Sequence, residues 1–402
     1  MSIFVSIAAY RDPELAPTLR DCIGRARYPD DLRFGVCWQH GEEEAAPAEF
    51  ADPRVRVIDV PWRLSRGPCW ARAEIMQLWN QEDFFLQLDS HHRFVQDWDA
   101  KLLAHAERSA TARPLLTTYA AVYQPDDGAP TRGAPMQMDF DRFTETGIPL
   151  FRPRAIDDCQ ALDRAPRARF VSAHFLFTLG SFVNDVSYDP ELYFTGEEIV
   201  LAIRAFTHGY ALLHPPEHIL WHEYTRAYRR KHWDDHVRAL GVDMEWHARD
   251  AVSVAKVQRF LTDPHVGPFG CGSARTFADY EAYAGLSFIH RAAQDATLQG
   301  LEPPNPPLPA TWPTDMRTWR VRIRLERANL PAAALNAPRL WYVGFHDGEN
   351  VEIYREDASE DDARRLAQSG SETIVIEREF RSARRPTSWT VWPVTADGEW
   401  LE

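Results

Sequence analysis

The N-terminal part of the chain alternates short apolar runs with segments of helical periodicity, and this alternation leaves few folds open to it. The apolar runs, each of strand length, are residues 3–9, 32–38, 54–60 and 84–88. Helical periodicity fills residues 15–27 and 69–79 between them. Repeated β-α units predict an α/β fold with a mostly parallel, doubly wound sheet, and they place ligands at the carboxyl ends of its strands.

A change of pattern after residue 302 predicts a second structural unit in this chain of 402 residues. A proline-rich run over residues 303–313 is typical of a stiff linker. Alternating apolar segments follow it at residues 319–325, 340–345, 373–380 and 389–394. We therefore expect an α/β domain over residues 1–302, the linker, and a small β-rich, sandwich-like accessory domain over residues 314–402.

The stretch from residue 123 to residue 169 is rich in Pro, Gly, Asp and Arg and shows weak periodicity. A connection of this length inside a compact domain is usually functional. We expect a loop or lid there that contacts a substrate.

Charge and cysteine content exclude several classes of protein. A net charge of -14 and a pI of about 5.6 do not fit a nucleic-acid binder, which needs a dense basic surface. The five cysteines are scattered without a CxxC pair, so we expect no disulfide framework, no zinc knuckle and a reducing compartment. We find no signal-peptide pattern and no apolar run of bilayer length. These features predict a cytoplasmic protein without a membrane span.

The apolar run at residues 84–88 ends in Asp89, Ser90 and His91. Residues two apart in an extended segment point the same way, so Asp89 and His91 can bind one ion. A carboxylate and an imidazole suit Mn²⁺ or another divalent cation. The alternative is a turn in which Asp89 or Ser90 caps the next element, and spacing alone leaves both interpretations open. The neighbouring His92 is expected to be solvated.

Three more histidines, His214, His218 and His222, fall within one short strand-and-loop segment. A lone histidine is more often a packed or surface residue than a ligand. His222 follows an apolar strand, which makes it the best candidate among them for a third metal ligand.

A predicted helix opens with Thr195, Gly196, Glu197 and Glu198. Thr195 and Glu198 have the spacing of a capping box, which gives Glu198 a sufficient structural role. Glu197 has no such explanation, although acidic residues are common in the first turn of a helix because of its dipole. Glu197 is therefore a candidate functional carboxylate.

A second predicted helix start carries Arg66 and Arg72 around a Gly67-Pro68 turn. Free backbone amides at a helix start bind anions, and arginine suits the geometry of phosphate. The alternative is a simple proline-initiated helix with exposed arginines.

Taken in order, six segments resemble the cytoplasmic glycosyltransferases that attach N-acetylglucosamine (GlcNAc) from UDP-GlcNAc to a protein hydroxyproline. The segments are IFVSIAAYRDPEL (3–15), RGPCWAR (66–72), FFLQLDSHHRFVQDWD (84–99), YFTGEEIVLAIRAFTHGY (193–210), WHEYTR (221–226) and GCGSARTFADYEAYAG (270–285). The resemblance covers roughly residues 1–290. A more distant likeness is to the polypeptide N-acetylgalactosaminyltransferases, which use a similar Asp-Ser-His element, a later histidine as third metal ligand and a Gly-Glu helix start.

The resemblance implies a glycosyltransferase A-type fold, in which a nucleotide-binding sheet carries the metal motif at a strand end. It implies a site for Mn²⁺, or for Mg²⁺, formed by Asp89, His91 and His222. The implied donor-binding residues are Ser90 with Tyr10, Arg11, Gln39, Arg66 and Arg72, of which Arg72 would contact the diphosphate. The resemblance implies that Glu197 faces the acceptor or the sugar, and we predict Glu197 and Glu198 as the catalytic carboxylates.

The resemblance also implies a reaction: metal-dependent, retaining transfer of GlcNAc from UDP-GlcNAc to a hydroxyl of a protein, peptide or glycan acceptor. Acceptor contacts are then expected in the stretch 123–169. Two alternatives remain open. A nucleotide-sugar hydrolase would share the donor and metal sites but lack an acceptor groove, and a non-catalytic carbohydrate- or protein-binding module would leave the biological role to the second domain.

Overall fold

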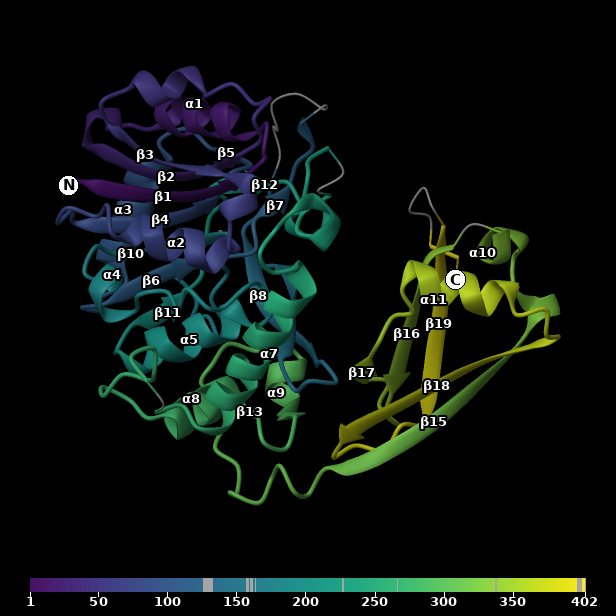
Figure 1. Cartoon of the computed structure of the whole chain (residues 1–402). Coiled ribbons are helices and arrows are strands. Elements are labelled where there is room, and N and C mark those ends of the chain that lie inside the picture. Colours follow the sequence, from purple (N-terminus) through teal and green to yellow (C-terminus); the bar gives the residue numbers. More distant parts are fainter. Residues whose placement is uncertain are drawn as a thin grey trace.

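The computed structural model shows a large α/β unit followed by a smaller unit of strands and helices (Figure 1). The described residues are 1–125, 133–156, 159, 162, 164–225, 228–265, 267–336, 338–395 and 400–401. Arg226, the last residue of the segment 221–226 that carries part of the resemblance, lies outside them.

The large unit is built on a seven-stranded sheet with the order β11-β6-β10-β4-β1-β2-β3. Its strands are β1 (Ile3–Tyr10), β2 (Leu32–His40), β3 (Val55–Pro61), β4 (Phe84–Asp89), β6 (Pro114–Thr117), β10 (Phe175–Leu179) and β11 (Ala211–Leu213). β1 pairs in parallel with β2 and with β4, whereas β10 runs antiparallel to β4 and β6. The prediction of a mostly parallel α/β sheet is confirmed, with one antiparallel strand inserted.

Helices cover both faces of this sheet, because successive side chains of a strand point to opposite faces. The helices are α1 (Leu15–Arg25) and α3 (Trp98–Arg108) on one face, and α2 (Pro68–Met76), α5 (Glu197–Thr207) and α8 (Phe277–Ala284) on the other. In β1, Val5 and Ile7 pack with the first group and Phe4 packs with the second. Burial on both sides explains the continuous apolar run of β1.

A small three-stranded sheet at the carboxyl end of β4 positions the candidate metal ligands. β5 (His92–Phe94) follows β4 after a bend at Ser90, and β12 (Leu220–His222) lies between β5 and β7 (Ala121–Val122). Antiparallel pairing of β12 with β5 sets His222 opposite His92. Segments far apart in the sequence therefore meet where β4 ends.

Part of the stretch expected to be a loop or lid is instead an antiparallel hairpin of β8 (Met136–Phe143) and β9 (Pro149–Ala155). Pro149 and Pro153 concealed β9 in the sequence, because proline removes a ladder donor and is tolerated mainly in edge strands. The hairpin forms its own two-stranded sheet in the described chain. Residues 126–132, 157, 158, 160, 161 and 163 of the same stretch lie outside the described residues.

The large unit also contains several shorter helices and strands and the longer helix α7. They are α4 (Phe182–Asp185), α6 (His232–Asp235), α7 (Trp246–Thr262), α9 (Asp295–Leu298), β13 (Leu286–Ser287) and β14 (Ala292–Ala293). In the described part of the chain, no helix combines the length and the apolar character needed to cross a membrane.

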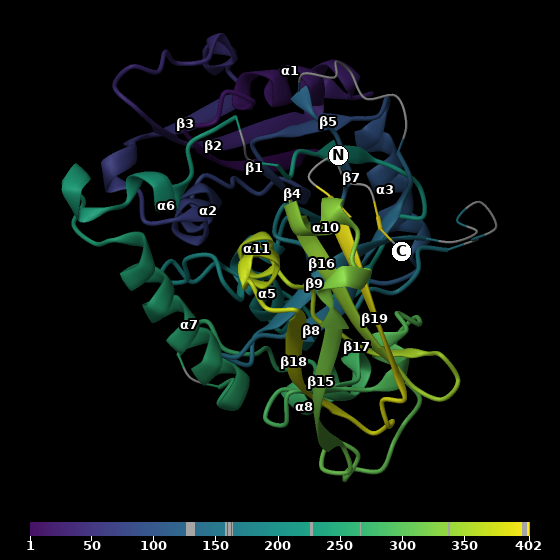
Figure 2. The same cartoon turned by 90° about the vertical axis from the view of Figure 1, so that its right-hand side faces the viewer.

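The C-terminal unit is β-rich, as predicted, and contains two small antiparallel sheets. β15 (Arg317–Glu326) pairs with β18 (Thr373–Ser382), and β16 (Pro338–His346) lies between β17 (Glu352–Arg355) and β19 (Ser388–Thr395). In Figure 2 these strands lie in front of β8 and β9, so this unit stands beside the hairpin face of the large unit.

A separate core holds the C-terminal unit together. Ile323 of β15, Trp341 of β16 and Ile376 of β18 are buried in one cluster. The helix α11 (Glu360–Gln368) packs against β16 and adds Ala363 to this core, and the sequence did not predict either this helix or α10 (Ala332–Asn336). The C-terminal unit therefore combines its two small sheets with the helix α11.

The segment between the two units is exposed over residues 306–311, whereas Asn305 is buried and hydrogen-bonds to Thr297 and Gln294. We therefore expect a nonspecific protease to cut first within residues 306–311 and to leave two resistant fragments. Mass spectrometry of the fragments locates the cut. A first cut well inside residues 1–290 would contradict the predicted division into domains.

Candidate active site

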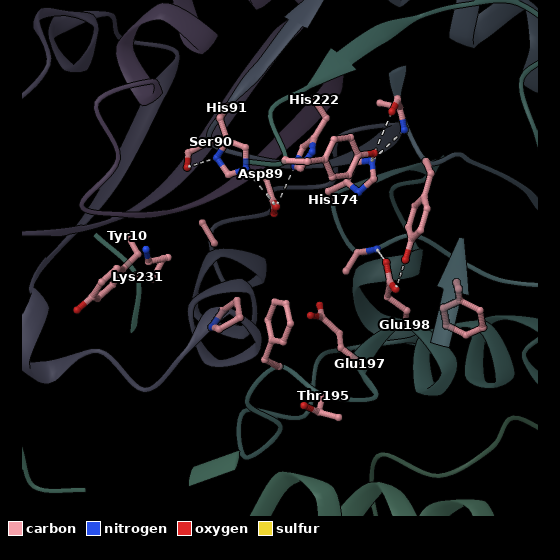
Figure 3. Close-up of a pocket in the computed structure, with 18 of the residues that line it drawn as sticks. Tyr10, Asp89, Ser90, His91, His174, Thr195, Glu197, Glu198, His222 and Lys231 are labelled. Carbon is pink, nitrogen blue, oxygen red and sulfur yellow. Dashed lines mark hydrogen bonds and ion pairs between the residues drawn. The ribbon is translucent and has the colours of Figure 1, made fainter. Parts of the chain in front are cut away.

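A cleft of about 650 Å³ opens at the carboxyl ends of β1, β2 and β4. Nine of the predicted site residues line it: Tyr10, Gln39, Arg72, Asp89, Ser90, His91, Glu197, Glu198 and His222. Figure 3 shows Tyr10 at one end of the cleft, Glu198 at the other, and the group of Asp89, His91 and His222 between them. The structure therefore brings most of the predicted residues together in one cavity.

Asp89, His91 and His222 point their ligating atoms at one place. The Asp89 Oδ2 atom lies 3.4 Å from Nε2 of His222 and 3.7 Å from Nε2 of His91. All three ligating atoms lie within 4.8 Å of one another. One carboxylate and two imidazoles at this spacing can hold a divalent cation.

The hydrogen bonds of His91 select a tautomer in which Nε2, the ring nitrogen that faces Asp89, carries a lone pair. Its Nδ1 atom lies 2.7 Å from Oδ2 of Asp12, and Nη2 of Arg229 lies 3.3 Å from its Nε2. A guanidinium can only donate, so Nε2 accepts and Nδ1 carries the proton that is donated to Asp12. A histidine held by a carboxylate in this way, with a lone pair toward the site, has the form of a metal ligand.

Asp12 is buried, yet it remains an effective hydrogen-bond acceptor for His91. Burial alone would raise the pKa of Asp12, but the charges and hydrogen bonds of His91, Arg229 and Ser90 hold it below its usual value. The Ser90 hydroxyl donates to the same Oδ2 atom at 2.6 Å. Ser90 thus acts in this structure through Asp12, behind the metal-ligand group.

His222 is surrounded by aromatic rings. The ring of His174 stacks on it at 4.3 Å between centroids, and Tyr224 lies edge-on at 4.2 Å. Burial, followed by the repulsion of neighbouring histidines, holds the pKa of His222 well below its usual range, so the ring stays neutral. Its Nδ1 atom is buried without a hydrogen-bond partner among the described residues. Ring packing and the 3.4 Å contact of Nε2 with Asp89 therefore orient this ring.

Arg72 lies at the floor of the cleft and joins two carboxylates. Its Nη2 atom donates to Oδ1 of Asp89 at 2.6 Å, and Nη1 donates to Oε1 of Glu197. Burial alone would lower the pKa of Arg72, but Glu197, Tyr188 and Asp89 raise it well above its usual range. The diphosphate contact predicted for Arg72 would therefore be made by a guanidinium that already holds two acids in place.

The predicted capping box of α5 is wrong. The N-cap is Gly196, with a φ of 87°, and Thr195 donates its hydroxyl to Oδ1 of Asp250 at 3.0 Å. Glu198 turns away from the cap and accepts from the hydroxyl of Tyr119 at 2.6 Å and from the backbone N–H of Ala173 at 3.0 Å. Spacing in the sequence could not reveal these partners, because they come from distant segments.

The environment of Glu198 favours its protonated form. Burial raises the pKa of Glu198 to about 7, although the hydrogen bonds from Tyr119 and Ala173 oppose this effect. The carboxyl group therefore titrates near neutral pH at the end of the cleft away from Tyr10.

At the opposite end, Tyr10 and Gln39 line the cleft and are held by neighbouring groups. The Tyr10 ring stacks on His232 at 3.8 Å between centroids, and its hydroxyl donates to Oδ2 of Asp235 at 3.1 Å. The Gln39 amide donates to the Ala9 carbonyl at 3.1 Å and accepts from Ser65 at 2.5 Å. These two side chains form a polar and aromatic end to the cleft.

Arg11 and Arg66, both predicted to bind the donor, do not line the cleft. Arg11 instead donates to Oε1 of Glu44 at 2.9 Å and to Oδ2 of Asp235 at 3.1 Å. Arg66 is exposed and lies over the ring of Trp70 at 5.9 Å. The position of Arg66 agrees with the alternative prediction, an exposed arginine near a proline-initiated helix.

The expectation that His92 is solvated is wrong. His92 is fully buried, and burial lowers its pKa to about 4. Sequence reasoning also missed Asp12, His174 and Arg229, which contact the three candidate ligands. Asp12 lies just beyond the end of β1, where a ligand is expected in such a sheet, but the sequence gives no comparable signal for His174 or Arg229.

The family model described as Glycosyltransferase (GlcNAc) matches residues 2–53 and 47–290. These matches span well over half of the chain, and the protein therefore belongs to this glycosyltransferase family. The mostly parallel sheet flanked by helices agrees with the predicted glycosyltransferase A-type fold, and the candidate metal motif lies at the end of β4. The match does not extend to the C-terminal unit, and no curated protein matches the chain.

Two groups of solved structures are similar to the chain. GalNAc-T7 with UDP, GalNAc and Mn²⁺ is 15% identical, with a TM-score of 0.45 over 70% of this chain and 54% of that chain. The chain thus spans little more than half the length of GalNAc-T7. S. aureus TarS, residues 1–349, in complex with UDP-GlcNAc is 12% identical, with a TM-score of 0.35 over 67% of this chain and 77% of that chain.

Replacing Asp12 with Asn should weaken binding of Mn²⁺ by about 10–100-fold, because the carboxylate that fixes the tautomer of His91 becomes a neutral amide that can also donate. Isothermal titration of the chelator-treated protein measures the affinity. Asp52→Asn, which alters a carboxylate paired with Arg54 outside the cleft, is the matched control. Equal affinity in Asp12→Asn and the wild type, with melting temperatures preserved, would show that Asp12 does not support a metal site.

The raised pKa of Glu198 predicts a pH-dependent stability. Its ordinary pKa is 4.5 and its folded value is about 7, so the folded state binds the proton more tightly than the unfolded state. The stabilisation is complete below the ordinary pKa and is lost as pH rises through about 7. Relative to Glu198→Gln, the wild type should therefore lose free energy of unfolding between about pH 5 and about pH 8.

Denaturant unfolding at several pH values tests this expectation. Glu191→Gln is the control, because Glu191 is exposed and pairing with Lys256 lowers its pKa, which places its titration outside this window. A constant stability difference between the wild type and Glu198→Gln across the window would contradict the assigned pKa.

Proposed function

We propose that this protein transfers GlcNAc from UDP-GlcNAc to a hydroxyl group of a protein or peptide, with retention of the anomeric configuration and with a divalent cation. The observation that carries the proposal is the convergence of Asp89, His91 and His222 beside the Arg72 and Glu197 pair. Membership of the Glycosyltransferase (GlcNAc) family supports the transfer of this sugar. The resemblance in the sequence supports hydroxyproline as the acceptor residue and retention as the stereochemical outcome.

Asp89, His91 and His222 would hold the cation, and Mn²⁺ suits their mixed carboxylate and imidazole character better than Mg²⁺ does. When bound, the ion supplies positive charge that offsets the charge of the departing diphosphate. Asp89 can serve the ion through Oδ2 while Oδ1 stays bonded to Arg72. Arg72 would thus keep the Asp89 carboxylate oriented.

The cleft also offers cationic groups for the diphosphate. Arg72, Arg229 and Lys231 line it, and the Nε–H group of Arg72 is buried without a hydrogen-bond partner among the described residues. An unpaired buried donor is costly, and an anionic ligand would satisfy it. The uridine would then lie at the Tyr10 and Gln39 end, where aromatic and amide groups face the cleft.

Glu197 and Glu198 would serve the acceptor side in different ways. Glu197 is held by Arg72 close to the candidate ligands, so it would orient the acceptor hydroxyl or the sugar. Glu198, with a pKa of about 7, would accept a proton from or return one to the acceptor side near neutral pH. We assign no protein nucleophile.

The test is the turnover of UDP-GlcNAc with and without peptides that carry Ser, Thr or 4-hydroxyproline. Sugar transfer that is abolished by chelation and restored by Mn²⁺ is expected. Release of UDP at the same rate with and without every acceptor would favour a nucleotide-sugar hydrolase. Absence of both UDP binding and turnover would favour a non-catalytic module.

Glu197→Gln should lower the transfer rate at least about a hundredfold while UDP binding persists, because one positioned polar group in the reacting site is lost. Arg72 keeps Asp89 as a partner in this variant, so the fold should survive with a reduced melting temperature. Glu191→Gln serves again as the matched control. Normal transfer by Glu197→Gln would remove Glu197 from the mechanism.

A further inference from the structure

A second cavity, of about 660 Å³, lies between the β8–β9 hairpin and the C-terminal strands β17 and β18. Its wall on the hairpin side includes Arg142 and Arg152, and its opposite wall includes Glu352, Tyr354 and Arg378. It is as large as the cleft that holds the candidate active site. Half of its wall belongs to the unit outside the family match, and the proposed transfer gives that unit no role.

The two cavities meet at one residue. Leu150 of β9 lines both of them. Its neighbours Pro149 and Phe151 line the active-site cleft, whereas Arg152 lines the second cavity. Because neighbouring side chains of a strand point to opposite faces, β9 presents one face to each cavity, and Leu150 borders both.

The cleft on its side of β9 is apolar. Val122, Met136, Leu150 and Phe151 line the cleft, and Glu198 lines it together with Tyr119, His174 and Tyr224. A charged side chain placed among the apolar residues would lose hydration. An acceptor with small or apolar groups next to its hydroxyl fits this part of the cleft.

The second cavity is lined by charges of both signs and by aromatic rings. Arg152 approaches Glu352 across it at 3.5 Å, a loose pair in which each side chain is 31% exposed. Tyr354 stacks on Phe380 at 4.4 Å between centroids, and both rings reach the wall. Loose, partly hydrated ion pairs contribute little by themselves, so an incoming charged group can replace either partner.

We propose that the two cavities form one acceptor groove for an extended polypeptide, and that the C-terminal unit binds the acceptor. This inference rests on the proposed function. The hydroxyl-bearing residue, with apolar neighbours, enters the cleft beside Glu198, and the chain continues past Leu150 into the second cavity. There its charged side chains pair with groups such as Arg152 and Glu352.

The mixture of positive and negative side chains in the second cavity favours a polypeptide over other acceptors. A neutral glycan has no charges to pair with the arginines and glutamates of the second cavity, and a polyanion would meet Glu352, Glu356 and Glu377 there. A peptide with lysines and glutamates near the modified residue matches both signs at once. The same peptide needs apolar residues next to its hydroxyl to match the cleft.

The experiment compares three peptides with the wild-type full chain and UDP-GlcNAc. The first is a pentapeptide in which alanines flank a central 4-hydroxyproline, and parallel sets carry Ser or Thr there. The second extends this core on both sides with alternating Lys and Glu, and the third extends it with Gly and Ser. The peptide with charged flanks should have a kcat/KM about tenfold above the other two, through a lower KM.

Two charge reversals in the second cavity, Arg142→Glu and Arg152→Glu, should reduce the kcat/KM ratio of charged-flank peptide to pentapeptide about tenfold. Arg324→Glu is the matched control, because Arg324 is exposed on β15 and does not line the cavity. It should keep the wild-type ratio. Using a ratio makes the comparison insensitive to partial loss of folded protein.

Equal kcat/KM values for the three peptides, or an unchanged ratio in both cavity variants, would overturn the acceptor groove while leaving the proposed transfer intact. Transfer to a free sugar or a glycan without transfer to any peptide would also overturn it. Absence of UDP-GlcNAc turnover together with absence of UDP binding would instead overturn the proposed function, and the groove with it.

Discussion

The buried guanidinium of Arg72 is the group on which the arrangement of the active site depends. It comes from α2 and joins Asp89, at the end of β4, to Glu197, in the first turn of α5. Each of these three charges would be costly to bury alone, and their pairing offsets part of that cost. The pairing therefore fixes the distance between the end of β4, which carries the candidate metal ligand Asp89, and the first turn of α5, which carries Glu197. Loss of either acid would leave Arg72 poorly compensated.

Around this centre, support comes from groups that do not face the cleft directly. Asp12 fixes the tautomer of His91, and Thr18 of α1 bonds through its hydroxyl to the carbonyl of Ser90 at 2.9 Å and to the backbone N–H of His92 at 2.9 Å. His222 depends on the rings of His174 and Tyr224 and on its 3.4 Å contact with Asp89. Ring packing thus contributes to the support of His222, whereas a buried carboxylate supports His91.

The sequence was sufficient for the large α/β unit because its signals are local. Apolar runs of strand length and helical periodicity recur at short range, and the Asp89-Ser90-His91 motif sits at the end of one such run. The role of Glu198 was misread because its partners, Tyr119 and Ala173, are distant in the sequence and only the fold brings them to it. The same reason hid His174 and Arg229. The hairpin was missed because Pro149 and Pro153 imitate a loop.

The two prolines of β9 affect how this strand could recognise a bound polypeptide. A strand can recruit another strand by offering backbone donors and acceptors along an open edge, which recognises almost any sequence. Proline has no N–H to offer, and in sheets it is placed on edges that face away from a partner strand. With Pro149 and Pro153 two positions either side of Phe151, β9 is poorly suited to add a strand by backbone pairing. Recognition along β9 must then come from side chains, and selectivity can evolve there by single substitutions without disturbing the sheet.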